Sequence, residues 1–140
     1  MEKKKKNIVI ATGGTGGHIF PSISLSSFLS DEYHVEFVTD ERGLKYLGSQ
    51  KNLKVNVVSS SRIFSKNVFK IFMSLIKIFF SIISSLKLLI KLKPNLVVGV
   101  GGYSSFAVCL SAYVLKIPIL IYEPNLVIGR ANRFLLPLSK

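Results

Sequence analysis

Acidic residues are scarce in this sequence: Asp and Glu total 7 against 19 Lys and Arg, which gives a formal net charge of +12. Between Arg42 and Tyr122 there is no acid, whereas twelve basic residues lie in that stretch. The single cysteine, Cys109, excludes an intrachain disulfide framework, and we expect it to be a small buried side chain in a reducing cytosol. A hydrophobic content of 49% in 140 residues excludes disorder and suits one domain with its own core.

A surface so poor in acids should attract phosphates, either of nucleic acid or of anionic lipid. Proteins that bind single-stranded nucleic acid present aromatic side chains together with arginine on an open platform. Here the aromatic residues Phe64, Phe69, Phe72, Phe79 and Phe80 fall in a helix-like stretch with few arginines. We therefore expect an anionic membrane surface as a partner, and no nucleic acid.

Strand-like apolar runs alternate with helix-like runs along the chain. The expected strands are 7–11, 35–39, 54–58, 96–100 and 118–122. The expected helices are 19–30, with Pro21 in its first turn, 42–49, 66–92, 103–115 and 129–138. Continuous apolar strands in a βαβ series predict an α/β fold, a Rossmann-like parallel sheet with helices on both faces. Because ligands in such folds lie beyond the carboxyl ends of the strands, loops 12–18, 101–106 and 123–129 should meet at one rim.

Four glycines, Gly13, Gly14, Gly16 and Gly17, follow the first expected strand and lead toward a helix, with His18 directly after them. Glycine leaves the backbone uncovered and adopts positive φ at little cost. A strand joined to a helix by such a loop can hold an anion or a sugar phosphate at the helix N-terminus. A tight turn alone needs one or two glycines, so we favour a binding loop over a packing turn.

The glycine loop matches the dinucleotide-binding pattern only in part. When GxGxxG is started at Gly14, Ile19 stands where the third glycine belongs. Asp40 does follow the second expected strand at about the distance of a ribose-binding carboxylate. A nicotinamide-dependent enzyme is therefore a minor alternative, whereas the phosphate-binding Walker pattern is absent because no Lys-Ser or Lys-Thr follows the glycines.

The expected helix over 66–92 combines basic and apolar residues. At 3.6 residues per turn its lysines fall within a sector of about 100°, with serines beside them and most apolar residues opposite. The longest charge-free run, 78–86, is shorter than the roughly 20 residues of a membrane span. We expect a helix in the membrane interface; a surface helix packed on the sheet and a calmodulin-type target are alternatives. The expected membrane contacts are Phe72, Leu75, Phe79, Phe80, Lys70, Lys77 and Lys87.

Three motifs follow one another along the chain. They are the loop 13–18 with Phe20-Pro21 after it, the loop 99–106, and Glu123-Pro-Asn125 with Gly129 and Ala131-Asn132 after it. Together they resemble the family of bacterial peptidoglycan UDP-N-acetylglucosamine transferases. The match covers nearly the whole chain but only the N-terminal half of that family, and its order and spacing make it specific.

The resemblance implies that residues 1–140 form the acceptor- and membrane-binding N-terminal domain of a GT-B glycosyltransferase. The implied reaction moves GlcNAc from UDP-GlcNAc to the MurNAc 4-hydroxyl of undecaprenyl-linked lipid I, with inversion, and yields lipid II. It needs no cofactor and no essential metal, and it takes place on the cytoplasmic face of the bacterial inner membrane, where the enzyme is peripheral. Since the family's donor-binding C-terminal domain is absent from these residues, we expect weak UDP-GlcNAc binding and no transfer by this chain alone. A separate chain carrying that domain is a possible partner.

The resemblance also implies roles for individual residues. The implied UDP-GlcNAc contacts are Thr15, Gly16, Gly17 and Asn125, and the implied contacts to the acceptor and its pyrophosphate are Gly13, Gly14, Gly101, Gly102 and Tyr103. His18 is the candidate base or acceptor-orienting group, because an imidazole titrates in a useful range. Glu123 is a rival base, with the alternative that it is a structural carboxylate binding backbone N–H groups.

The chain departs from the family in the third motif. Tyr122 and Pro124 stand where the family commonly has His and Gln, and Pro124 removes a backbone donor. Ala107 stands where Pro is common. A different class of function is the alternative: a non-catalytic membrane-docking subunit that recruits a separate UDP-GlcNAc-binding catalytic chain.

Overall fold

The computed structural model describes residues 5–48, 50, 52–59 and 68–139, with the side chains of all of these except 68–71. The strands are β1 (Asn7–Thr12), β2 (His34–Thr39), β3 (Lys54–Val57), β4 (Leu96–Gly101) and β5 (Ile119–Ile121). The helices are α1 (Gly16–Leu29), α2 (Glu41–Leu47), α3 (Val68–Leu92), α4 (Tyr103–Val114) and α5 (Arg130–Leu135), followed by the 3₁₀ turn η1 (Leu136–Leu138).

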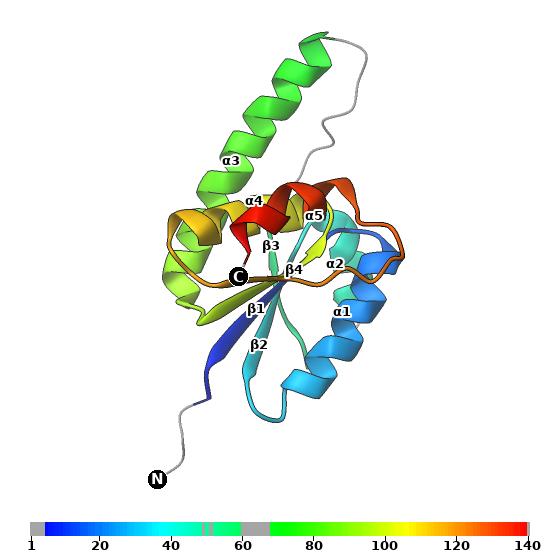
Figure 1. Cartoon of the computed structure of the whole chain (residues 1–140), viewed down its shortest axis with the longest axis vertical. Coiled ribbons are helices and arrows are strands. Elements are labelled where there is room, and N and C mark those ends of the chain that lie inside the picture. The colour runs from blue at the N-terminus through cyan, green and yellow to red at the C-terminus, as the bar shows by residue number, and fades with distance from the viewer. Residues whose placement is uncertain (1–4, 49, 51, 60–67, 140) are drawn as a thin grey trace.

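The strands form one five-stranded sheet in the order β3-β2-β1-β4-β5, and every neighbouring pair is parallel. Helices α1 and α2 cover one face, and α3, α4 and α5 cover the other (Figure 1). The predicted Rossmann-like sheet is therefore confirmed. Because the central strand β1 lies between β2 and β4, the loops that follow β1 and β4 are neighbours at the carboxyl rim.

Two apolar layers hold the sheet between its helices. Val9 and Ala11 of β1 pack in the layer under α3, α4 and α5, while Ile8 and Ile10 pack in the layer under α1 and α2. Side chains alternate between the two faces of a strand, so a strand buried on both sides must be apolar throughout. The continuous apolar runs of the sequence thus encode both layers.

Helix α1 begins at Gly16, three residues before the predicted start at Ile19. Pro21 consequently lies inside the helix and not in its first turn, which corrects the prediction. Since proline has no N–H, it cannot donate to the carbonyl of Gly17 four residues earlier. The earlier start places Gly16, Gly17 and His18 in the first turn of the helix that follows β1.

The last helix is shorter than predicted. The sequence pattern predicted one helix over 129–138, whereas α5 ends at Leu135 and a 3₁₀ turn containing Pro137 follows it. The stretch 59–65 between β3 and α3 is polar, so the sequence predicts a loop there; apart from Ser59 it lies outside the described residues.

Helix α3 buries several serines and exposes several large apolar side chains. Ser74, Ser81 and Ser85 are buried, and the hydroxyl of Ser111 on α4 donates to the carbonyl of Ile82 at 3.1 Å. The apolar residues Phe72, Leu75, Phe79, Phe80 and Ile90 are instead 54–61% exposed. Small serines let α4 approach closely, so the serine face packs inward. On the helical wheel these serines lie beside the lysines, and the structure adds that Ser74, Ser81 and Ser85 are buried whereas Lys77, Lys87 and Lys91 are exposed.

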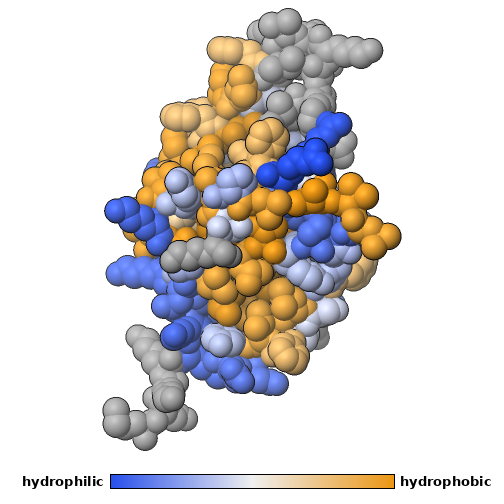
Figure 2. All heavy atoms as spheres, in the orientation of Figure 1, coloured by the Kyte–Doolittle hydropathy of each residue, from blue (hydrophilic) through white to orange (hydrophobic). Residues whose placement is uncertain are grey.

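The exposed side of α3 is therefore largely apolar, as Figure 2 shows along its length. Among the described helices, α3 is long and apolar enough over Phe72–Leu92 to cross a membrane by length and composition alone. From the short charge-free run 78–86 we expected α3 to be unable to span a membrane. That expectation was too strict, because a membrane-spanning helix can contain a few lysines. Its serine face nevertheless packs on α4, as a helix of the folded domain does.

Candidate functional site

The three loops predicted to meet at the carboxyl rim do so. Residues that follow β1, β4 and β5 line one hollow of about 240 Å³. Its lining consists of His18, Gly101, Gly102, Tyr103, Glu123, Gly129, Arg130, Ala131 and Asn132. Segments more than one hundred residues apart thus supply one concave surface with an imidazole, a carboxylate and a guanidinium.

Glycine is required where the first two loops touch. The N–H of Gly13 donates to the carbonyl of Gly101 at 2.7 Å, and a Cβ on Gly13 would lie 2.8 Å from Cα of Gly102. Gly101 and Gly102 also have φ of +118° and +88°, which side chains with a Cβ rarely adopt. These glycines therefore bring two loops together, and the N–H of Gly13 is already used within the fold.

His18 lies in the first turn of α1 with its ring over Gly101: a Cβ on Gly101 would lie 2.9 Å from Cε1 of the ring. The Nδ1 atom of His18 is buried and has no hydrogen-bond partner in the part of the chain that the structure describes. An unsatisfied buried nitrogen costs free energy unless a ligand supplies the partner. His18 also lines the hollow, so its ring borders the space that a molecule bound there would occupy.

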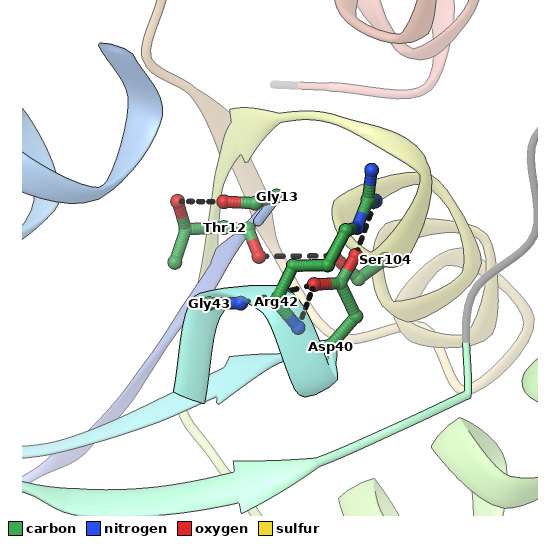
Figure 3. Close-up of polar contacts among 6 residues, drawn as sticks. All are labelled: Thr12, Gly13, Asp40, Arg42, Gly43 and Ser104. Atoms are coloured by element: carbon green, nitrogen blue, oxygen red, sulfur yellow. Dashed lines mark hydrogen bonds and ion pairs between the residues drawn. The ribbon is translucent and has the colours of Figure 1, made fainter. Parts of the chain in front are cut away.

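Two helix N-termini point at the same rim. Neither the N-cap residue of α1, Thr15, nor that of α4, Gly102, provides a side-chain cap. The first N–H groups of a helix have no partner within it, and the helix dipole makes this end favourable for anions. Ser104 fixes the two ends relative to each other, since its hydroxyl donates to the carbonyl of Thr12 at 2.9 Å (Figure 3).

Glu123 is saturated with hydrogen bonds. Oε1 accepts from the backbone N–H of Asn125 at 3.1 Å and from its Nδ2 at 2.8 Å. Oε2 accepts from the N–H of Gly129 at 2.8 Å and from Nδ2 of Asn132 at 2.9 Å. Desolvation by burial raises the pKa of this carboxyl, but these hydrogen bonds outweigh it and hold the pKa below its ordinary value. The arrangement favours a structural carboxylate over a base.

Asn132 and Arg130 are site residues that the sequence reasoning did not single out for a role. Asn132 is fully buried in α5, and its Nδ2 donates to Glu123 while its Oδ1 has no partner among the described residues. The available signal in the sequence was an asparagine three residues after Gly129, near the start of the expected helix. Its burial could not be inferred from the sequence, because it depends on how α5 packs on α4 and β4.

Asp40 is committed to capping a helix. Its Oδ1 accepts from the N–H groups of Arg42 and Gly43 at 3.0 and 3.1 Å, and its Oδ2 pairs with the guanidinium of Arg42 at 2.6 Å (Figure 3). The carboxylate is only 3% exposed. A ribose-binding acid has to present its oxygens to the ligand, so this geometry speaks against the nicotinamide alternative.

Within the described ranges, no three His, Cys, Asp or Glu side chains are grouped so that they could hold a metal ion. Cys109 is fully buried, as predicted, and burial raises the pKa of its thiol to about 12. It lies beside Ser105, away from the lining of the hollow. Its role is packing.

Comparison with known proteins identifies close relatives. The profile of the glycosyltransferase family 28 N-terminal domain matches residues 8–139. The UDP-N-acetylglucosamine–N-acetylmuramyl-(pentapeptide) pyrophosphoryl-undecaprenol N-acetylglucosamine transferase of Pelagibacter ubique is 39% identical over 132 residues, which are 94% of this chain and 36% of the relative. The enzyme of the same name from Rickettsia bellii is 38% identical over 136 residues, 96% of this chain and 37% of the relative. The chain thus spans about a third of the length of these relatives.

Solved structures agree. The crystal structure of Acinetobacter baumannii MurG matches with a TM-score of 0.81 and 28% identity, over 96% of this chain and 40% of that one. The UDP-GlcNAc 2-epimerase of Neisseria meningitidis, solved with UDP-GlcNAc bound, matches with a TM-score of 0.62 and 17% identity, over 95% of this chain and 39% of that one. The second likeness concerns the fold alone.

Proposed function

This chain belongs to glycosyltransferase family 28, as an N-terminal domain of that family, and from that membership we propose that it is the acceptor-binding half of a peptidoglycan GlcNAc transferase. The donor is UDP-GlcNAc and the acceptor is lipid I, the undecaprenyl-pyrophosphoryl muramyl pentapeptide. GlcNAc passes to the MurNAc 4-hydroxyl with inversion, and the product is lipid II. The names of the relatives carry the same donor and acceptor groups.

One observation supports this assignment most directly. The three motifs that resemble the family are separated along the chain, yet the fold brings them to one hollow at the carboxyl rim. A shared α/β fold alone does not require this, because functions differ among proteins of one fold. The coincidence of motif and hollow is what a common binding site predicts.

In the proposed mechanism His18 takes the proton of the acceptor hydroxyl. A sugar hydroxyl is a weak nucleophile, and a positioned base removes its proton as the new glycosidic bond forms. His18 lines the hollow with its ring over Gly101, which supports this role or that of orienting the acceptor. Glu123 instead positions the loop and α5, because both of its oxygens are already engaged.

The diphosphate groups are held by the uncapped ends of α1 and α4. Thr15, Gly16 and Gly17 at the first end contact the donor, and Gly101, Gly102 and Tyr103 at the second end contact the acceptor pyrophosphate. Gly13 and Gly14 contribute through their lack of side chains, which lets the loop pack closely and leaves the helix ends open. Asn125 contacts the donor from the loop that Glu123 holds in place.

The exposed apolar side of α3 docks the domain on the cytoplasmic face of the membrane, where a lipid-linked acceptor is found. Phe72, Leu75, Phe79 and Phe80 enter the acyl boundary, and Lys87 meets anionic phosphates. Lys77 lies at the border of this side, and the side chain of Lys70 lies outside the described residues. The same surface would serve a non-catalytic docking subunit, because the exposed apolar side chains of α3 suit membrane docking whether or not the domain takes part in catalysis.

A chimera tests the enzymatic proposal. Residues 1–140 are joined to the remaining part of the Pelagibacter ubique relative, and lipid II formation from UDP-GlcNAc and lipid I is measured. We expect turnover by the chimera, a loss of at least about 100-fold in His18→Ala, and full activity in His34→Ala, which changes the exposed histidine that begins β2. The 140-residue chain alone should bind UDP-GlcNAc weakly and transfer no sugar. Turnover by that chain alone, or an active chimera with His18→Ala, contradicts the proposal. A folded but inactive chimera that carries the native His18 would favour the docking subunit.

A further inference from the structure

A second hollow lies on the other side of the glycine loop. It measures about 310 Å³ and is lined by Asp40, Glu41, Arg42, Ser59 and Lys77. These residues come from the end of β2, the start of α2, the segment after β3, and α3. The hollow is polar and the function proposed above makes no use of it.

The glycine loop separates the two hollows. A Cβ on Gly13 would meet Gly102 on the side of the first hollow, at 2.8 Å from its Cα. A Cβ on Gly14 would meet α2 on the side of the second, at 2.6 Å from Cβ of Arg42 and 3.0 Å from the N atom of Gly43. Two glycines, which carry no side chains, therefore lie between Gly102 of the first hollow and Arg42 of the second.

The second hollow carries charges of both signs. The guanidinium of Arg42 pairs with Asp40 (Figure 3), and the Arg42 side chain is 39% exposed. Lys77 of α3 also lines this hollow. Glu41 adds an exposed carboxylate. A guanidinium suits the two oxygens of a carboxylate. The two neighbouring acids oppose a dianionic phosphate more than a single carboxylate. Of the two, the exposed Glu41 is placed to accept peptide N–H groups, because the oxygens of Asp40 are already engaged by Arg42 and Gly43. This mixture of basic and acidic side chains is complementary to the C-terminal end of a peptide, which has a carboxylate and backbone N–H groups.

We propose that this second hollow binds the peptide of the acceptor, with the terminal carboxylate on Arg42 and Lys77. The inference rests on the proposed function, since the relatives' names place a pentapeptide on the muramyl sugar. A peptide attached through its amino end presents a free carboxylate at the other. Five extended residues span up to about 17 Å, which is long enough to pass over one loop. Lys77 then serves this hollow as well as bordering the apolar side of α3.

The test is a binding measurement on the 140-residue chain by calorimetry with three soluble probes. They are N-acetylmuramic acid 1-phosphate, the same sugar phosphate carrying the pentapeptide, and that pentapeptide probe with its C-terminal carboxyl amidated. We expect the peptide to strengthen binding to the native chain and amidation to remove most of the gain. Arg42→Gln and Lys77→Gln should each weaken binding of the pentapeptide probe about tenfold. Neither variant should change the affinity for the peptide-free probe.

Matched controls remove the same charge elsewhere. Lys45→Gln on α2 and Lys91→Gln on α3 change exposed lysines outside both hollows and should bind all three probes as the native chain does. Because Arg42 also pairs with Asp40, thermal unfolding of each variant is checked, and Lys77→Gln, for which no such pair is expected to be lost, tests the inference independently.

The outcomes separate the two claims. If both muramyl phosphates bind the native chain equally, or if both variants bind the pentapeptide probe normally, the peptide site is wrong while the proposed acceptor function stands. If neither probe binds, the proposed acceptor function is itself overturned. If the two variants lose binding to vesicles containing anionic lipid but keep the preference for the peptide, the hollow takes a lipid headgroup and the inference fails.

Discussion

The side-chain amide of Asn132 donates a hydrogen bond of 2.9 Å to Oε2 of Glu123, which ties the loop after β5 to the helix that follows it. The same oxygen also accepts from the N–H of Gly129 at the start of that helix. Glu123 thus acts as a clamp on one wall of the hollow. Its geometry leads directly to the first prediction.

Glu123→Gln should destabilise the fold by about 1–3 kcal/mol, because a new amide NH₂ must face N–H donors that the carboxylate now satisfies. Urea unfolding at pH 7 measures the loss. Glu32→Gln, an exposed acid in the turn after α1, is the matched control and should change stability by less than about 0.5 kcal/mol. Equal stability of the two variants would show that the clamp contributes nothing.

The stability difference between the native chain and Glu123→Gln should depend on pH. Hydrogen bonds hold the pKa of Glu123 below its ordinary value despite the opposing effect of desolvation. Its contribution is therefore fully present above the unfolded-state pKa of about 4.5 and is lost as the pH falls through the lower folded-state pKa. The stability difference between the native chain and Glu123→Gln should be largest at neutral pH and shrink below pH 4.5. A difference that grows in acid would contradict this sign.

Two glycine variants should separate folding from binding. Gly14→Ala places a methyl group against Asp40 and Arg42, so we expect a loss of about 1–3 kcal/mol in unfolding free energy. Gly17→Ala meets nothing within 4 Å and lies in the first turn of α1, so stability should be unchanged or higher. Because that methyl group projects into open space at the proposed donor site, UDP-GlcNAc binding by the chimera should weaken. An equally stable Gly14→Ala would mean that the loop is not packed on α2.

Cys109 should be inert in the folded chain. Burial raises the pKa of its thiol to about 12, so at pH 8 the thiolate fraction is roughly one in ten thousand, and no reagent reaches it. Iodoacetamide should label Cys109 only when urea unfolds the chain, at a rate that reports unfolding. Rapid labelling without denaturant would show that α4 separates readily from β4, against which the Cys109 sulfur lies.

The exposed aromatic pair on α3 should control membrane binding. Phe79 and Phe80 are 61% and 60% exposed, and their rings contact each other edge to face at 6.0 Å. Replacing both with serine should weaken co-sedimentation with anionic vesicles by at least about tenfold, since each buried phenyl contributes about 1.5–3 kcal/mol. Phe28→Ser, which removes an 82% exposed ring from α1, is the control and should bind vesicles normally. Normal binding by the double variant would place the membrane surface elsewhere.

The sequence by itself determined the class of fold and predicted the rim at which a site would lie. Apolar runs such as the one in β1 can be buried on both faces only in a parallel sheet covered by helices, so the strands were readable from local pattern, whereas their order in the sheet came from the structure. The glycines at 13–17 and 99–102 were informative because only a close approach or a positive φ requires so many. Those local constraints also sufficed to predict that three loops meet at one rim.

Tertiary structure decided what each side chain does there. Glu123 became a clamp and Asp40 a helix cap because partners from other segments or the following turn lie within hydrogen-bonding distance, which no spacing in the sequence reveals. The serines of α3 turned inward because α4 approaches closely enough to prefer small side chains, and this left the phenylalanines outside. Patterns of residue type encode local geometry, whereas the burial of a side chain depends on contacts between segments far apart in the chain.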